Sequence, residues 1–216
     1  MNALINGESI LEYLEKNRKP TTDLEREMEE FAKSNKIPIL DYKSAELLEL
    51  LIELKQPRFA LEIGTAIAYS SIKIANKMPK DGVLDTIEKS KDNLALAHNF
   101  IKKAELTNKI NVIFDNALTI LAKSDKKYDF IFLDADKQDY EKLFYLSLPL
   151  LNTNGIIFID NLLWKGYVAE NLEDVPTSFR TSTEQVMSFN KIFLGEKSLN
   201  SQIFPIGDGI GIGIKR

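Results

Sequence analysis

Short apolar runs that stop at, or just before, a glycine or an acidic residue recur along the chain after Pro57. They occupy residues 59–64, 83–88, 112–114, 130–134 and 156–160. Longer amphipathic stretches separate them, near 70–78, 91–105, 117–123 and 138–151. Strands that alternate with helices in this way pair in parallel through right-handed crossovers. The pattern therefore predicts a doubly wound α/β sheet in the middle of the chain.

The patterns of apolar and charged residues at the two ends of the chain differ from that of the central part. Residues 1–55 place apolar and charged side chains at helical spacing, which predicts about three helices. A last helix is predicted near 177–194 and is followed by two strand-like runs, 201–206 and 209–215. The turn Gly207-Asp208 between these runs favours an antiparallel hairpin at the edge of the sheet.

The length of 216 residues suits one sizeable core and does not demand a second domain. There is no internal repeat and no long linker. We therefore expect one domain over 1–216, in which a helical extension, 1–55, precedes an α/β core, 56–216.

The composition restricts the chemistry that the chain can perform. It has no cysteine, which excludes disulfides, thiolate zinc sites and cysteine nucleophiles together. His98 is the only histidine and lies among polar neighbours in a helical stretch, so we interpret it as a surface residue. Any bound metal must therefore be held by oxygen ligands.

Charge and hydropathy bear on location and partners. The N-terminus lacks the basic start and apolar run of a secretory signal, and no apolar stretch reaches membrane-spanning length. We expect a cytoplasmic protein with no membrane partner. The net charge of −4 argues against a protein whose whole surface binds nucleic acid, although a local basic patch can exist on an acidic chain.

Ligands of open α/β sheets bind beyond the carboxyl ends of the strands, so the residues that close each apolar run are candidates for a site. Gly64 closes the first run and begins a turn in which backbone amides can approach a ligand closely. The three glycines of a pyrophosphate-binding turn are absent, which disfavours a dinucleotide. Glu88 closes the second run, where a carboxylate can accept hydrogen bonds from both ribose hydroxyls. This pair favours a nucleoside without a diphosphate. The alternative is an ordinary strand-ending glycine and a solvated glutamate.

Two neighbouring strand ends carry oxygen donors. The run 130–134 ends at Asp134, and the run 156–160 ends at Asp160 and is followed by Asn161. Adjacent parallel strands lie ~4.8 Å apart, so the three side chains can face one crevice and share a cation. Such a set suits an octahedral Mg²⁺ and leaves positions for water and substrate oxygens. A cation there would favour the deprotonated form of a bound hydroxyl.

Several side chains next to this cluster have competing interpretations. Lys137 is placed to accept the proton of a hydroxyl, because a neighbouring cation and partial burial would both lower the pKa of its amine. Asp136 is interpreted as the N-cap of the helix that begins near Lys137, and Asp139 as a first-turn acid. Trp164 and Tyr167 are candidates for the wall of a substrate pocket or for the core.

With these residues in place, the chain resembles the metal-dependent O-methyltransferases of the caffeoyl-CoA and catechol type, a branch of the class I S-adenosylmethionine-dependent methyltransferases. The likeness runs from about Pro38 to the C-terminus. It rests on the segments LEIGTAIAYS (61–70), DADK (134–137), DNLLWKG (160–166) and PIGDG (205–209). The resemblance implies a Rossmann-like seven-stranded sheet with the final hairpin at its edge, and a homodimer.

The resemblance also implies roles for individual residues. The metal, Mg²⁺ or another divalent cation such as Ca²⁺ or Mn²⁺, would be bound by Asp134, Asp160 and Asn161. Lys137 would be the general base, so that Lys137 and Asp134 are the catalytic residues. Glu62, Gly64 and Ser70 would contact the methionine end of S-adenosylmethionine. Glu88 would contact its ribose, and Asn116 and Ala117 its adenine. The implied cofactor-binding residues are Leu40, Glu62, Gly64, Ser70, Glu88, Asn116, Ala117 and Asp134.

Two residues depart from the family pattern. The family usually has glycine where this chain has Ala68, and aspartate where it has Asn116. We expect cofactor binding to survive, because Ala68 suits a helical backbone at the start of a helix. Asn116 can still accept a hydrogen bond from an adenine amino group.

Similarity to one group of proteins within the family narrows the choice of methyl acceptor. The run Ile37-Pro38-Ile39-Leu40, the phrase GTAI (64–67) and the short length are most similar to bacterial tRNA 5-hydroxyuridine methyltransferases. This similarity implies a wobble uridine of tRNA as acceptor, converted to 5-methoxyuridine. A small catechol-like molecule offers two adjacent oxygens in the same way and stays an alternative.

Two other classes of protein also stay open. A nicotinamide-dependent oxidoreductase is disfavoured by the missing glycine fingerprint. A non-catalytic cofactor-binding module is disfavoured by the retained acids and Lys137.

Overall fold

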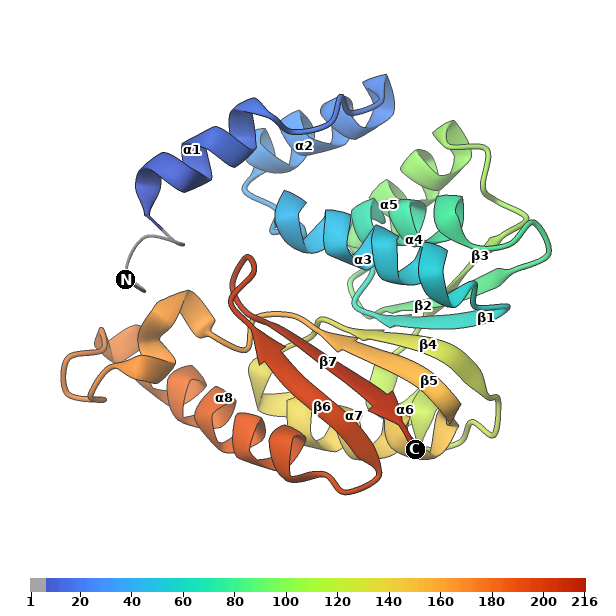
Figure 1. Ribbon diagram of the computed structural model, residues 1–216. Coiled ribbons are helices and arrows are strands. Elements are labelled where there is room, and N and C mark those ends of the chain that lie inside the picture. The colour runs from blue at the N-terminus through green and yellow to red at the C-terminus, as the bar shows by residue number, and fades with distance from the viewer. Residues whose placement is uncertain (1–6) are drawn as a thin grey trace.

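In the computed structural model, which describes residues 7–216, a seven-stranded sheet lies between two layers of helices (Figure 1). The strand order is β3-β2-β1-β4-β5-β7-β6. The strands are β1 (Phe59–Ile63), β2 (Val83–Glu88), β3 (Ile110–Phe114), β4 (Tyr128–Leu133), β5 (Leu151–Ile159), β6 (Leu199–Phe204) and β7 (Ile210–Lys215). β1 to β5 pair in parallel, whereas β7 pairs antiparallel with both β5 and β6. The predicted doubly wound sheet with an antiparallel hairpin at its edge is confirmed.

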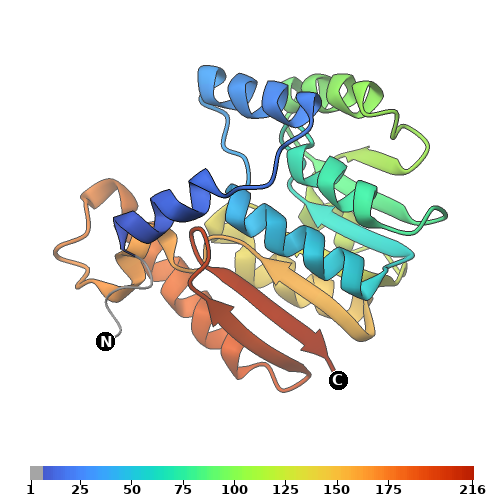
Figure 2. The same cartoon turned by 45° about the horizontal axis from the view of Figure 1, so that its top comes forward.

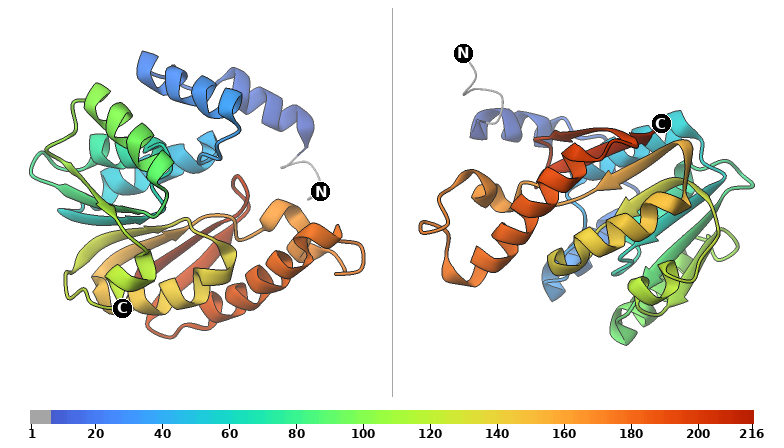
Figure 3. Two further views of the ribbon diagram at one scale, coloured as in Figure 1. Left: turned by 180° about the vertical axis from the view of Figure 1, so that it is seen from behind. Right: turned by 90° about the horizontal axis from the view of Figure 1, so that it is seen from below.

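Helices cover both faces of the sheet (Figure 3). The helices on one face are α3 (Tyr42–Lys55), α4 (Tyr69–Lys77) and α5 (Lys91–Lys103), and those on the other are α6 (Ala117–Leu121), α7 (Tyr140–Ser147) and α8 (Thr177–Gly195). Strand residues alternate between the two cores: Phe130 joins the first and Ile131 the second. Because both faces are covered, β4 and β5 have continuous apolar runs, at 130–133 and 156–159. Among residues 7–216, no helix is long and apolar enough to span a membrane.

Two further helices precede α3, namely α1 (Glu8–Lys16) and α2 (Asp23–Asn35). They lie on the α3–α5 side of the sheet (Figure 2), where Met28 and Ala32 of α2 join the core. A capping box between Thr22 and Glu25 begins α2. The three helices predicted for the start of the chain are confirmed over the described residues.

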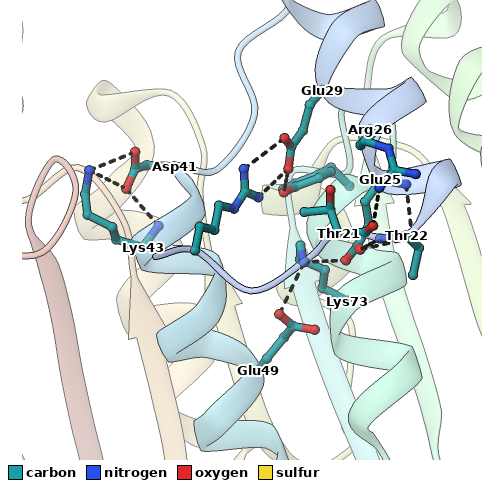
Figure 4. Close-up of polar contacts among 11 residues, drawn as sticks. Thr21, Thr22, Glu25, Arg26, Glu29, Asp41, Lys43, Glu49 and Lys73 are labelled. Atoms are coloured by element: carbon teal, nitrogen blue, oxygen red, sulfur yellow. Dashed lines mark hydrogen bonds and ion pairs between the residues drawn. The ribbon is translucent and has the colours of Figure 1, made fainter. Parts of the chain in front are cut away.

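Charged side chains connect α2, α3 and α4 (Figure 4). The Lys73 side chain is only 6% exposed, and its ammonium lies 2.5 Å from Glu25 and 3.2 Å from Glu49. A second ion pair, at 2.6 Å, joins Arg18 to Glu29. A buried ammonium requires such partners, because an unpaired charge is costly to remove from water. The Lys73 ion pairs join α2 and α3, the helices on either side of the linker whose Pro38 and Ile39 line the cavity described below.

Some element boundaries differ from the prediction. β5 begins at Leu151, ahead of the apolar run at 156, and its pairing with β4 is irregular between Tyr128 and Phe130. The helix predicted over 138–151 is divided into a 3₁₀ turn, α7 and a second 3₁₀ turn that contains Pro149. Proline lacks the backbone N–H that a continuing α-helix needs.

Candidate active site

A cavity of about 860 Å³ opens beyond the carboxyl ends of β1, β2, β4 and β5, the edge at which doubly wound sheets bind ligands. The predicted site residues that line it are Gly64, Glu88, Asn116, Ala117, Asp134, Lys137, Asp160 and Asn161. Leu40, Glu62 and Ser70 are buried and lie outside its lining. The topology thus brings most of the predicted residues to one cavity.

The turn after β1 has a backbone conformation that few residues adopt. Gly64 has a φ of +104°, and a Cβ atom there would lie 1.9 Å from the backbone oxygen of Asp134. Ala66 and Ala68 also have positive φ, +47° and +68°. The prediction of a helical backbone at Ala68 is therefore wrong, because this residue precedes α4 in the left-handed conformation. Glycine is free of strain in that conformation, whereas alanine is not.

Replacing Gly64 with alanine is expected to lower the free energy of unfolding by about 3 kcal/mol, since overpacking and a strained φ each cost about 1–3 kcal/mol. Either the turn or the end of β4 must move, and Asp134 moves with it. Urea unfolding curves measure the change. Gly195→Ala is the matched control, because its new Cβ would meet no atom within 4 Å. Equal stability of the Gly64→Ala and wild-type proteins would contradict the close approach to Asp134.

Glu88 is fixed at the cavity wall by donors from two segments. The backbone N–H groups of Ala66 and Ser90 donate to its carboxylate at 2.8 and 2.7 Å, and the side-chain amide of Asn93 lies at 3.4 Å. A carboxylate has about four acceptor positions, so one remains for a hydroxyl of a ligand. The group is therefore held in place and still able to bind.

Asn116 has a structural task in addition to its predicted one. It is the N-cap of α6, and its side-chain oxygen accepts a hydrogen bond from the backbone N–H of Leu118 at 2.9 Å. An amide oxygen has two lone pairs, so one acceptor position is left toward the cavity. Ala117 follows on the same cavity wall.

Glu62 lies behind the turn rather than on the cavity wall. Its carboxylate is fully buried and accepts hydrogen bonds from the hydroxyls of Ser70, Ser71 and Thr86. Burial raises the pKa of Glu62 to about 7, and the three hydroxyls oppose that rise. These bonds attach the start of α4 to β1. Contact of Glu62, Ser70 or Leu40 with the cofactor stays a prediction.

Asp134 and Asp160 follow β4 and β5, which are neighbouring parallel strands. Burial raises the pKa of Asp134 and, together with repulsion from Asp134, raises the pKa of Asp160 to about 7. The ammonium of Lys137 opposes both shifts. The ionised forms of these two neighbouring carboxyl groups repel each other. A cation bound between them would stabilise both negative charges.

Lys137 lies in the middle of the site. Its ammonium donates hydrogen bonds to the side-chain oxygen of Asn161 and the hydroxyl of Tyr140, both at 2.6 Å, and to the backbone oxygen of Ala135 at 3.1 Å. The Asp134 carboxylate is 3.7 Å away. Burial lowers the pKa of Lys137, whereas the surrounding carboxylates raise it. An amine held in this way is positioned to exchange a proton with a group beside Asp134.

The donor set fits a divalent cation that prefers oxygen. Asp134 and Asp160 supply carboxylates, and Asn161 supplies an amide oxygen, which are ligand types of Mg²⁺ and Ca²⁺. Across residues 7–216 there is no cluster of three or more acidic or histidine side chains that could hold a metal. A cation here would therefore depend on the amide oxygen and on oxygens from water or substrate.

Two side chains of the site escaped prediction from the sequence. The hydroxyl of Tyr140, which is fully buried, donates to the backbone oxygen of Asp160 at 3.0 Å. Asp208 lines the cavity, and its carboxylate accepts a hydrogen bond from the amide nitrogen of Asn161 at 3.4 Å. Tyr140 had the pattern of a core residue, and Asp208 that of an ordinary turn.

The prediction that Asp136 caps the helix that begins near Lys137 is correct in position but not in its hydrogen bond. Asp136 occupies the predicted N-cap position of the 3₁₀ turn Lys137–Asp139, but its side chain makes no capping hydrogen bond. The carboxylate instead forms an ion pair with Lys89 at 2.5 Å. This pair lies at the cavity rim, where both side chains are more than half exposed.

Comparisons with known proteins agree with this geometry. The profile of the O-methyltransferase family matches residues 15–216. A caffeoyl-CoA O-methyltransferase of Populus kitakamiensis is 35% identical over 169 residues, which cover 76% of this chain and 72% of that protein. A solved structure from Staphylococcus aureus, assigned as a caffeoyl-CoA O-methyltransferase, has a TM-score of 0.86 and 29% identity over 96% of this chain and 98% of that one. The O-methyltransferase TomG of Streptomyces achromogenes, solved with S-adenosylmethionine, shares the fold with a TM-score of 0.83 and 24% identity, covering 100% and 99%.

The sheet topology and the cavity at its carboxyl edge define a protein with the Rossmann-like methyltransferase fold. The chain belongs to the O-methyltransferase family, whose members use S-adenosylmethionine as methyl donor. The enzyme class predicted from the sequence, an S-adenosylmethionine-dependent O-methyltransferase, is confirmed.

Proposed function

We propose that this enzyme methylates one of two adjacent oxygens of its acceptor with the help of a divalent cation. The observation that carries the proposal is the meeting of Asp134, Asp160 and Asn161 with the amine of Lys137 in one cavity. A cation bound by these oxygens would stabilise negative charge on the acceptor and orient its two oxygens. Lys137 accepts the proton of the reacting hydroxyl, whose oxygen then attacks the methyl group.

The methyl donor is proposed to bind at the other end of the cavity. Glu88 accepts a hydrogen bond from a ribose hydroxyl, because its carboxylate is already held by the backbone of Ala66 and Ser90. Asn116 and Ala117 border the adenine. Holding donor and acceptor in line contributes up to ~7–11 kcal/mol to the reduction of the barrier.

For the acceptor we propose 5-hydroxyuridine of tRNA, which becomes 5-methoxyuridine. Support comes from the similarity of residues 37–40 and 64–67 to bacterial tRNA 5-hydroxyuridine methyltransferases, and Pro38, Ile39 and Gly64 lie on the cavity wall. This task suits the cytoplasmic location expected from the sequence. A small phenol with two adjacent hydroxyls is the second candidate, supported by the caffeoyl-CoA O-methyltransferases among the relatives.

We also propose that the enzyme forms a homodimer. Leu50 and Leu54 are 60% and 81% exposed on α3. Phe204 and Ile214 are 38% and 42% exposed on the face of the β6–β7 hairpin opposite to α8. Contact with a second copy would remove these apolar side chains from water.

Methyl transfer from labelled S-adenosylmethionine tests the proposal, with tRNA that carries unmethylated 5-hydroxyuridine and separately with a catechol, each in Mg²⁺ or in chelator. We expect labelling of the wobble nucleoside that disappears with chelator. Labelling of the catechol alone would retain the chemistry and change the acceptor. Equal labelling in chelator would contradict the cation, and no labelling of either acceptor despite binding of the donor would contradict both proposed acceptors.

A further inference from the structure

Asp208 lies in the turn between β6 and β7 and reaches the loop after β5. Its carboxylate accepts a hydrogen bond from the side-chain amide of Asn161 at 3.4 Å and another from the backbone N–H of Lys165. The backbone N–H of Leu163 donates to the backbone oxygen of Asp208 at 2.9 Å. One turn residue therefore holds the loop that carries Asn161 at several points.

Two glycines allow this turn to approach its neighbours closely. Gly209 has a φ of +90°, and a Cβ there would lie 2.4 Å from the backbone nitrogen of Leu163. Gly207 has a φ of +56°, and a Cβ there would lie 2.2 Å from the hydroxyl oxygen of Ser44 in α3. The turn therefore packs closely against α3 on one side and the loop after β5 on the other. This packing holds Asp208, which lies between the two glycines in the sequence, in place.

The side-chain amide of Asn161 has one orientation that satisfies both of its neighbours. An ammonium can only donate, so the amide oxygen must face Lys137, 2.6 Å away. A carboxylate can only accept, so the amide nitrogen must face Asp208. Without an acceptor on the Asp208 side, the amide can turn over and present its nitrogen to Lys137, where two donors repel each other and the nitrogen cannot act as a cation ligand.

We propose that Asp208 is a positioning residue that keeps the amide oxygen of Asn161 turned toward the cation site and the general base. This inference rests on the proposed function, since it needs Asn161 as a cation ligand. Partners that orient a ligand from behind change metal affinity by about 10–100-fold when they are replaced. Asp208 is such a partner of Asn161, although the two residues are far apart in the sequence.

The test compares Mn²⁺ binding to the full-length wild-type and Asp208→Asn proteins by calorimetry. The new amide keeps its oxygen on the Lys165 N–H, the shorter of the two contacts, and turns its nitrogen toward Asn161. We expect the Kd for Mn²⁺ to rise about 10–100-fold. In the metal-free protein, the side-chain amide signal of Asn161 in a ¹⁵N–¹H spectrum is expected to shift.

An exchange of the two groups separates positioning from a general effect on folding. In the double variant Asn161→Asp/Asp208→Asn, the carboxylate at 161 accepts from the amide at 208 and offers an oxygen to the cation whichever way it turns. We expect this exchange to recover at least about tenfold of the lost affinity. The Asn161→Asp single variant is the reference for the added ligand charge. If Asp208 acts by orienting the amide, the further change Asp208→Asn should leave the Kd of the Asn161→Asp protein almost unchanged, because a carboxylate has no unfavourable orientation.

Asp136→Asn is the matched control, because it removes an acid from the same cavity wall without a hydrogen bond to Asn161. Its Kd should change less than about threefold, as expected for an exposed charge. Failure of the wild type to bind Mn²⁺, or an unchanged Kd in Asp134→Asn, would remove the cation site and the proposed function with it. An Asp134→Asn protein that loses Mn²⁺ beside an Asp208→Asn protein that keeps it, or an exchange that recovers nothing, would refute the positioning role alone.

Discussion

Asp134→Asn is expected to lower the rate of methyl transfer by about a thousandfold or more. A divalent cation contributes several kcal/mol of charge stabilisation, and every 1.36 kcal/mol corresponds to a factor of ten in rate. The substitution leaves Asp160 as the single carboxylate at the proposed cation site. The amide keeps the size of the side chain, so the loss is one of charge rather than of packing.

Single-turnover rates at saturating S-adenosylmethionine measure this effect. The melting temperature of the metal-free variant should stay near that of the wild type, because the amide also relieves the repulsion that raises the pKa of Asp160. Asp174→Asn, which changes an exposed acid that accepts a hydrogen bond from Asn171, serves as the control and should keep the full rate. An Asp134→Asn enzyme with the wild-type rate in Mg²⁺ would disprove the assignment of the cation site.

The parts of the fold that were predictable are those in which burial and local pattern coincide. β4 is buried on both faces, and its residues 130–133 appear in the sequence as an unbroken apolar run. β1 and β2 are buried as well and are mainly apolar, but they carry the buried polar side chains Glu62, Asp85 and Thr86. The start of β5 was not predictable, since residues 152–154 are polar and partly or fully exposed. Its strand character there comes from pairing with a neighbour, and the local sequence does not encode that neighbour.

The same distinction holds within the site. Asp134 and Asp160 were expected to meet, because the carboxyl ends of parallel strands share one edge of the sheet. The contact of Asp208 with Asn161 depends on β7 entering the sheet between β5 and β6, a strand order that spacing alone does not reveal. The left-handed backbone of Ala68 depends likewise on a turn that passes close to the end of β4.

Lys137→Met is expected to lower the rate of methyl transfer at neutral pH by about 10²–10⁴-fold, the usual contribution of a positioned general base. The sign of the pH dependence follows from the burial of the amine. A base acts only when neutral, so the wild-type rate should rise with pH up to the pKa of Lys137 and then level off. Burial lowers that pKa, so the plateau should begin below the ~10.4 of a free lysine. The variant should lack this rise.

Rate–pH profiles of the two enzymes test the role of Lys137, with Lys142→Met, an exposed lysine of α7, as the control that keeps its rate. Methionine is an unbranched side chain of similar length, and it removes the amine together with the contacts of its nitrogen with the rings of Tyr140 and Trp164. A Lys137→Met enzyme that stayed fast near neutral pH would show that the cation alone deprotonates the acceptor. Because methionine also removes the hydrogen bond from Lys137 to Asn161, that result would show that this bond is not needed for the rate, and the orientation of the amide would then depend on Asp208.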